Sequence, residues 1–177
     1  MKALVLYESM YGNTRRVAEA IAHGLDDTMP ALAVPVSDVT EEQVAECELL
    51  VVGGPTHVHG MSRPSTRRSA AGVASATAEV DFGAQVNVGI REWLSAAHPA
   101  VPAQSAVAFD TRNHGPVLIT GRASKGITEG LRRAGFRLLA KSESFEVGPG
   151  PSLVPEELER AARWGGELGR LIKDRGA

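Results

Sequence analysis

The sequence predicts an α/β protein, with a doubly wound parallel sheet of five strands and helices on both faces. Five segments with the pattern of strands alternate along the chain with segments whose apolar residues recur at helical spacing. The strongest run, at residues 49–52, is continuously apolar, as in a strand that is buried on both faces of a sheet. The length of 177 residues suits one domain, so we expect residues 1–177 to form a single domain.

Three strands and two helices are expected in the first half of the chain. The first helix places Val17 and Ile21 on one face. Pro35 has no N–H to donate, so the second strand is expected at an edge of the sheet. Thr40 followed by Gln43 is the pattern of a capping box, which predicts the start of the second helix. The expected elements are strand 2–7, helix 14–25, strand 31–36, helix 41–46 and central strand 48–54.

Two strands and three helices are expected in the second half. Ile90, Trp93 and Leu94 share one face of the third helix. Gly135 is expected to end the fourth helix, because glycine readily adopts the left-handed conformation found there. Pro155 suits the first position of the last helix. The expected elements are helix 88–97, strand 104–109, helix 124–134, strand 137–147 and helix 155–173.

Composition and charge exclude several classes of function. The 19 basic and 21 acidic residues give a formal charge of −2, which predicts no strong attraction to nucleic acid or to an anionic membrane. The chain has no apolar stretch near the roughly 18 residues of a membrane span. Cys47 is the only cysteine, so no intrachain disulfide can form. We therefore expect a cytoplasmic protein.

The segment Ser9-Met10-Tyr11-Gly12-Asn13-Thr14 separates the first strand from the first helix. The first amides of a helix lack intrahelical partners and carry the positive end of its dipole, so they can hold a phosphate. Ser9 and Thr14 add hydroxyl donors, and Gly12 permits a tight backbone path. Alternatively, Ser9, Asn13 and Thr14 only cap the helix. The chain has no G-x-x-x-x-G-K-S/T or G-x-G-x-x-G phosphate motif.

This loop resembles the phosphate loop of the flavodoxin family, T/S-x-T-G-x-T, with Tyr11 in the third position. Residues 53–56 (Gly-Gly-Pro-Thr) and 109–112 (Phe-Asp-Thr-Arg) occupy the positions of the family's second and third flavin loops, in the same order. The resemblance covers the chain except residues 62–86. It implies a flavodoxin-like fold that binds flavin mononucleotide (FMN).

The resemblance also implies which residues hold FMN. Many flavodoxins stack the flavin ring between Trp and Tyr, whereas these loops carry histidines and Arg112. Arg112 either faces the electron-rich edge of the flavin or pairs with a carboxylate such as Asp110. The implied set is Ser9, Met10, Tyr11, Gly12, Asn13, Thr14, Pro55, Thr56, His57, Val58, His59, Gly60, Asp110, Thr111, Arg112, His114 and Gly115. No third ligand accompanies His57 and His59 at a metal-site spacing, so we expect no metal centre.

The expected function is electron transfer inside the cell, between FMN and redox partner proteins. A first alternative is an FMN-dependent reductase of quinones or small molecules that uses NAD(P)H. A second is a flavin-free binding or regulatory module, because a fold does not determine a function. Residues 62–86 have no strong periodicity, and long loops of this kind are often functional. We expect them to wall or gate the face of the flavin ring.

Overall fold

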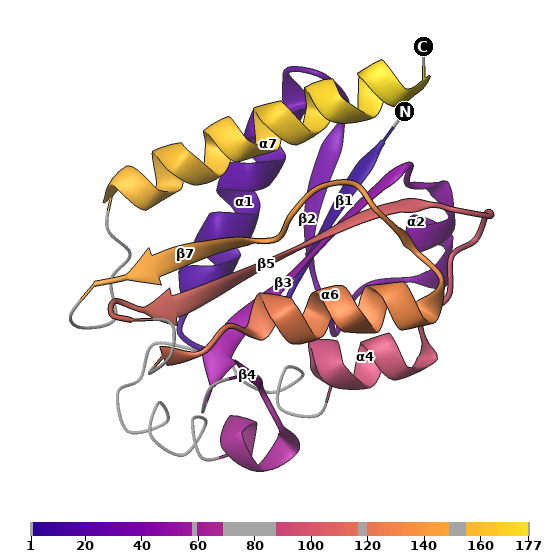
Figure 1. The fold of residues 1–177 in the computed structure, drawn as a ribbon. Coiled ribbons are helices and arrows are strands. Elements are labelled where there is room, and N and C mark those ends of the chain that lie inside the picture. The colour runs from indigo at the N-terminus through magenta and orange to yellow at the C-terminus, as the bar shows by residue number, and fades with distance from the viewer. Residues whose placement is uncertain (1, 58–59, 69–87, 117–119, 149–154, 177) are drawn as a thin grey trace.

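A parallel sheet runs through the centre of the molecule between two layers of helices (Figure 1). The computed structural model describes residues 2–57, 60–68, 88–116, 120–148 and 155–176. The strands are β1 (Ala3–Tyr7), β2 (Ala31–Pro35), β3 (Leu49–His57), β4 (Gly60–Met61), β5 (Ser105–Asn113), β6 (Arg137–Leu138) and β7 (Glu143–Val147). The helices are α1 (Asn13–Asp26), α2 (Glu41–Glu46), α4 (Ile90–Ala96), α6 (Ala123–Ala134) and α7 (Pro155–Gly176). Residues 64–68 add one helical turn.

The order of the strands confirms the predicted doubly wound sheet. The order is β2-β1-β3-β5-β6, with β7 also paired to β5. As predicted, β3 is central, β2 lies at an edge and the Thr40–Gln43 capping box begins α2. The predicted fifth strand is divided in two, because β6 pairs with the start of β5 and β7 pairs with its end. The short antiparallel β4 is a further difference from the five expected strands.

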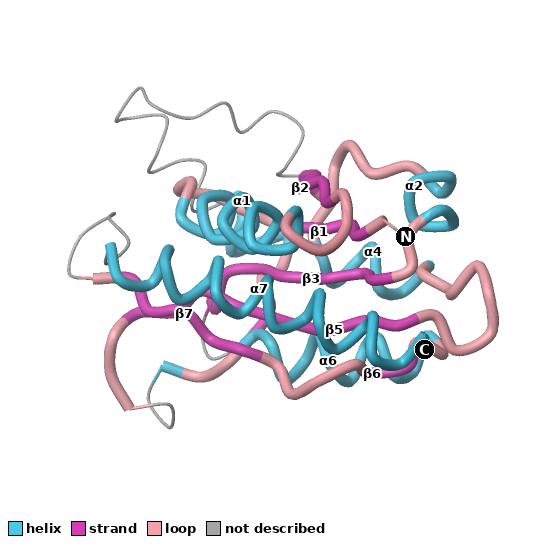
Figure 2. The backbone as a smooth tube through the Cα atoms, turned by 90° about the horizontal axis from the view of Figure 1, so that it is seen from above, coloured by secondary structure: helices cyan, strands magenta, loops and turns pink. Residues whose placement is uncertain are grey.

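The two faces of the sheet are covered by different helices, as Figure 2 shows in a view from above. Val5, Val51 and Val107 pack with α1 and α7 on one face. Their neighbours Leu50 and Ala106 pack with α2, α4 and α6 on the other. Both sets alternate along the strands because successive side chains of a strand point to opposite faces. The continuous apolar runs are therefore explained by burial on both sides.

Two strands extend further than the sequence predicts. β3 continues through His57, where Thr56 pairs with Met61 of β4. β5 continues to Asn113, because β7 provides hydrogen-bonding partners from Phe109 onward. Pro55 does not end β3, since the residue pairs with Thr111 of β5. Several residues that we expected in loops are thus held on strands at the carboxyl end of the sheet.

Only part of the segment at residues 62–86 can be compared with its predicted gating role. Residues 69–87 lie outside the described residues, and so do Val58 and His59. At the start of the segment, Ser62 and Arg67 are both 1% exposed, while residues 63–65 between them are exposed. Among the described residues, none of the helices has the length and apolar character needed to span a bilayer.

Candidate functional site

A pocket of about 440 Å³ lies at the carboxyl end of the sheet. It joins the loop after β1, the ends of β3 and β5 and the end of β7. In a parallel sheet the carboxyl ends of the strands meet at one edge, so loops far apart in the sequence converge there. The lining residues are Met10, Tyr11, Asn13, Thr14, Pro55, Thr56, His57, Thr111, Arg112, Asn113 and Val147.

The wall of the pocket formed by the first loop has the features of an anion site. Gly12 occupies the N-cap position of α1 with φ +81°, a conformation that favours glycine, and provides no side-chain cap. The first turn of α1 contains no acidic residue. The Ser9 hydroxyl is buried and has no hydrogen-bond partner among the described residues. The alternative was that side chains of this loop only cap the helix. The N-cap position is occupied by Gly12, which has no side chain, so this alternative is not supported there.

Thr14 connects this loop to strand β5. Its hydroxyl lies 2.7 Å from the hydroxyl of Thr111, and both side chains are buried. Either hydroxyl can donate in this pair, so the other keeps a proton for a further acceptor. The pair gives the pocket two neighbouring hydroxyl groups, one from α1 and one from β5.

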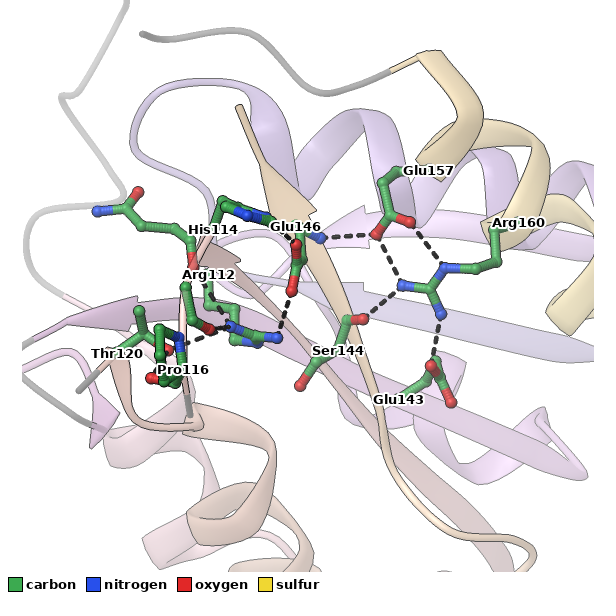
Figure 3. Close-up of polar contacts among 11 residues, drawn as sticks. Arg112, His114, Pro116, Thr120, Glu143, Ser144, Glu146, Glu157 and Arg160 are labelled. Carbon is green, nitrogen blue, oxygen red and sulfur yellow. Dashed lines mark hydrogen bonds and ion pairs between the residues drawn. The ribbon is translucent and has the colours of Figure 1, made fainter. Parts of the chain in front are cut away.

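The sequence left open whether Arg112 faces the flavin or pairs with a carboxylate such as Asp110. In the structure Arg112 is paired with a carboxylate, that of Glu146 (Figure 3). Arg112 Nη2 lies 2.5 Å from Glu146 Oε1, and Nη1 donates to the Gly115 carbonyl at 2.8 Å. The His114 ring Nδ1 lies 2.5 Å from Glu146 Oε2. One carboxylate thus holds both basic groups. The His114 side chain is 79% exposed and does not line the pocket.

Glu146 is held in place by the start of α7 (Figure 3). Its backbone N–H donates to Glu157 Oε2 at 2.6 Å, and the same oxygen lies 2.7 Å from Arg160 Nη2. Burial alone would raise the pKa of Glu157, but the hydrogen bonds from Arg160 and from the Glu146 amide hold that pKa below its usual range. Arg160 also pairs with Glu143 of β7. This cluster fixes the end of β7 against α7 and leaves Glu146 facing Arg112.

Two of the expected site residues cap α6. Asp110 is fully buried, and its Oδ2 accepts a hydrogen bond from the Ser124 N–H at 2.7 Å. The Thr56 hydroxyl accepts one from the Ala123 N–H at 2.9 Å. Carboxylates are favourable at a helix N-terminus because of its dipole. Asp110 contacts this backbone rather than the pocket, whereas Thr56 does both.

The pocket brings together nine of the expected site residues and leaves others aside. The nine are Met10, Tyr11, Asn13, Thr14, Pro55, Thr56, His57, Thr111 and Arg112. Gly60, Asp110, His114 and Gly115 are not among its lining residues, and Ser9 and Gly12 belong to the loop beside it. Asn113 and Val147 line the pocket but were not expected from the sequence. A signal for Val147 was available, because the predicted fifth strand ends there, at the same edge of the sheet as the others, and Asn113 lies within the predicted third loop.

Among the described residues, His57 is the histidine that lines the pocket, and burial lowers its pKa from the usual value. The described residues contain no group of three or more His, Cys, Asp or Glu side chains that could hold a metal ion. The donors around the pocket are hydroxyls, backbone amides, an imidazole and a neutralised guanidinium. This set suits an uncharged polar ring carrying a phosphate, with the phosphate at α1.

Comparisons with known proteins agree with this geometry. Residues 4–66 match the sequence profile of a flavodoxin domain family. An archaeal flavodoxin is similar in structure, with a TM-score of 0.66, 20% identity, and coverage of 98% of this chain and 99% of that one. A flavodoxin 1 from Bacillus cereus gives a TM-score of 0.64, 18% identity, and coverage of 96% and 98%.

Other similar structures belong to different flavodoxin-like proteins. A flavodoxin-like, WrbA-like protein from Agrobacterium tumefaciens has a TM-score of 0.62, 17% identity, and coverage of 98% of both chains. No curated protein sequence matches. At these identities the structural matches establish the flavodoxin fold for the whole chain, and the sequence profile adds a flavodoxin signature in its first third.

Proposed function

We propose that this flavodoxin-like protein binds FMN at the carboxyl end of its sheet and transfers electrons to and from partner proteins. The observation that carries the proposal is a single pocket that joins an uncapped helix N-terminus to the ends of β3, β5 and β7. The buried Ser9 hydroxyl, which has no hydrogen-bond partner in the described part of the chain, is a donor beside α1 that fits such a ligand. A phosphate would satisfy it.

In this proposal the first loop holds the phosphate by hydrogen bonds alone. The α1 amides, the Ser9 hydroxyl and the Thr14 hydroxyl are the donors, and no lysine or metal is needed. Pro55, Thr56 and His57 of β3 and Thr111 of β5 form the walls beside the ring. FMN supplies the electron chemistry when it is bound, while the protein supplies position and electrostatics.

The reductase for quinones or small molecules remains a second candidate function. It requires a substrate to reach the flavin ring, and Tyr11, which lines the pocket, is 45% exposed. The sequence contains no separate G-x-G-x-x-G dinucleotide motif, so a nicotinamide would have to contact the flavin directly. A flavin-free module on the same fold is the third candidate.

Absorbance titrations with FMN and with riboflavin test the proposal directly. We expect saturable binding of FMN with altered flavin absorbance bands, and much weaker binding of riboflavin. Absence of any flavin binding would contradict the proposed function and favour the flavin-free module. For the flavin-loaded protein, NAD(P)H oxidation in the presence of a quinone would identify the reductase, and its absence would favour the electron carrier.

Glu146 is expected to lower the reduction potential of bound FMN. Reduction adds negative charge to the cofactor, which a free positive charge nearby would stabilise. In the structure Glu146 neutralises the positive charge of Arg112 at the pocket wall. Glu146→Gln removes this negative charge and leaves Arg112 uncompensated. A unit charge within roughly 10 Å contributes on the order of 1–2 kcal/mol at an effective dielectric constant near 20. A reductive titration should therefore give a higher potential for the variant, and an unchanged or lower potential would contradict this role.

The burial of His57 predicts a pH dependence of stability in the flavin-free protein. Its pKa is lowered by burial, so below about pH 6.5 the unfolded chain binds more protons than the folded one. This contribution to the free energy of unfolding is present above pH 6.5 and is lost as the pH falls toward the folded pKa. Urea unfolding of the parent and of His57→Gln at pH 7.5 and 5.5 measures it. The variant should lose less stability at acid pH, and an equal loss would place His57 in solvent.

A further inference from the structure

A buried cluster of charged side chains lies directly behind the phosphate loop. Glu8, the last residue before Ser9, is 2% exposed, and Arg67 is 1% exposed. Arg67 Nη2 donates to Glu92 Oε2 at 2.8 Å, and Nη1 donates to the Ser62 hydroxyl at 2.9 Å. Charged side chains are rarely buried to this degree unless they are paired, so the cluster needs a reason.

Glu8 is fixed from two sides. Its backbone N–H donates to the Gly53 carbonyl of β3 at 2.9 Å. Its side-chain Oε2 accepts a hydrogen bond from the Ile90 N–H, the first residue of α4, also at 2.9 Å. Since Glu8 is bonded covalently to Ser9, these two contacts set the point from which the phosphate loop leaves the sheet.

The start of α4 is itself held by the rest of the cluster. Glu92 Oε2 accepts from the Gly89 N–H at 3.0 Å as well as from Arg67. A Cβ atom on Gly89 would lie 2.3 Å from Arg67 Nη1 and 2.7 Å from Glu8 Oε2, so both side chains pack against the bare glycine. The cluster therefore forms a chain of contacts from Arg67 through Glu92 and α4 to Glu8.

We propose that Glu8 is a positioning residue for the phosphate: through its hydrogen bond to Ile90 it holds the Ser9–Thr14 loop in the shape that receives FMN. The Arg67–Glu92 pair supports Glu8 by fixing α4. This inference rests on the proposed FMN site and adds a residue that does not line the pocket. Burial raises the pKa of Glu8, and the Ser62 hydroxyl, the Ile90 amide and the Arg67 charge act in the opposite direction.

Glu8→Leu and Glu8→Gln separate this role from a simple charge effect. If Glu8 acted only through its charge, both substitutions would remove negative charge near an anionic ligand and would strengthen FMN binding, or leave it unchanged if Glu8 is already protonated. Gln retains an oxygen that can accept from the Ile90 N–H, whereas Leu does not. We expect Leu to weaken FMN binding about tenfold or more, with riboflavin binding nearly unchanged, and Gln to keep most of the preference for FMN.

Gly89→Ala disturbs the same cluster without changing any charge. The φ of Gly89 is −118°, which alanine can adopt, so the added methyl group acts by displacing Arg67 and Glu8. We expect the same selective loss of FMN affinity. Glu129→Leu, an exposed position on α6, is the control for removing one negative charge elsewhere.

Titrations of all four variants with FMN and with riboflavin decide between the possibilities. Riboflavin binding also reports whether each variant is folded. A parent protein without a preference for FMN would overturn the phosphate site itself. If the parent protein prefers FMN, and Glu8→Leu and Gly89→Ala keep this preference, only the role of Glu8 is overturned. If Glu8→Leu and Glu8→Gln lose FMN affinity equally, the hydrogen bond to Ile90 is likewise excluded as the cause of the loss.

Discussion

Removing the Ser9 and Thr14 hydroxyls together is expected to weaken FMN binding by about a hundredfold or more. Hydrogen bonds to charged groups contribute roughly 1.5–3 kcal/mol each, and about 1.4 kcal/mol corresponds to a factor of ten in affinity. Ser9→Ala removes a buried hydroxyl that has no partner among the described residues, so the ligand-free protein should lose little stability. Thr14→Val keeps the β-branched shape of the side chain in the first turn of α1.

Riboflavin is the matched control for these variants because it lacks only the phosphate. Its binding should change by less than about threefold, since the walls formed by β3 and β5 remain intact. Thr14→Ser restores the hydroxyl and should recover most of the affinity for FMN. Thr14→Val also takes away the partner of the Thr111 hydroxyl, so a modest loss of stability is expected. Similar losses for FMN and riboflavin would show that the loop does not bind the phosphate.

The first loop could be singled out from the sequence because the function proposed for it is local. Six consecutive residues connect a strand to a helix, and their donors come from the backbone and from two hydroxyls in the same segment. The alternation of strands and helices could also be predicted, because each of these elements has a local pattern in the sequence. Burial on both faces makes β1 and the start of β3 continuous apolar runs, and the long helices show periodic apolar faces. Gly135, with φ +98°, ends α6 as expected, because this signal depends only on the local backbone.

The other side of the pocket depends on contacts between distant segments. Glu146 lies beside Arg112 only because β7 pairs with the second half of β5, and this register places Arg112 opposite Glu146. The carboxylate of Asp110, at the end of β5, likewise accepts a hydrogen bond from the Ser124 N–H at the start of α6. Spacing in the sequence does not encode either contact. The Glu8–Arg67 cluster was missed for the same reason, since its members are distant in the chain.

Gly165→Ala and Gly166→Ala, two neighbouring substitutions in α7, are expected to change stability in opposite directions. Helices α1 and α7 lie in close contact on one face of the sheet (Figure 2). A Cβ atom on Gly165 would lie 2.3 Å from the Ile21 carbonyl oxygen of α1, a backbone atom that cannot rotate away. A Cβ atom on Gly166 would meet nothing closer than 3.5 Å. The two neighbouring positions therefore differ in the room available for a side chain, although both lie in the same helix.

Gly165→Ala should lower the free energy of unfolding by about 3 kcal/mol, because overpacking at a close helix contact forces the two backbones apart. Gly166→Ala should raise it by up to about 1 kcal/mol, because alanine loses less backbone entropy than glycine in a helix. Urea unfolding monitored by circular dichroism measures both. Trp164, which is buried beside Phe145, provides a second probe of the same packing through its fluorescence. If both substitutions were stabilising, the two helices would have to be further apart than the Gly165–Ile21 contact requires.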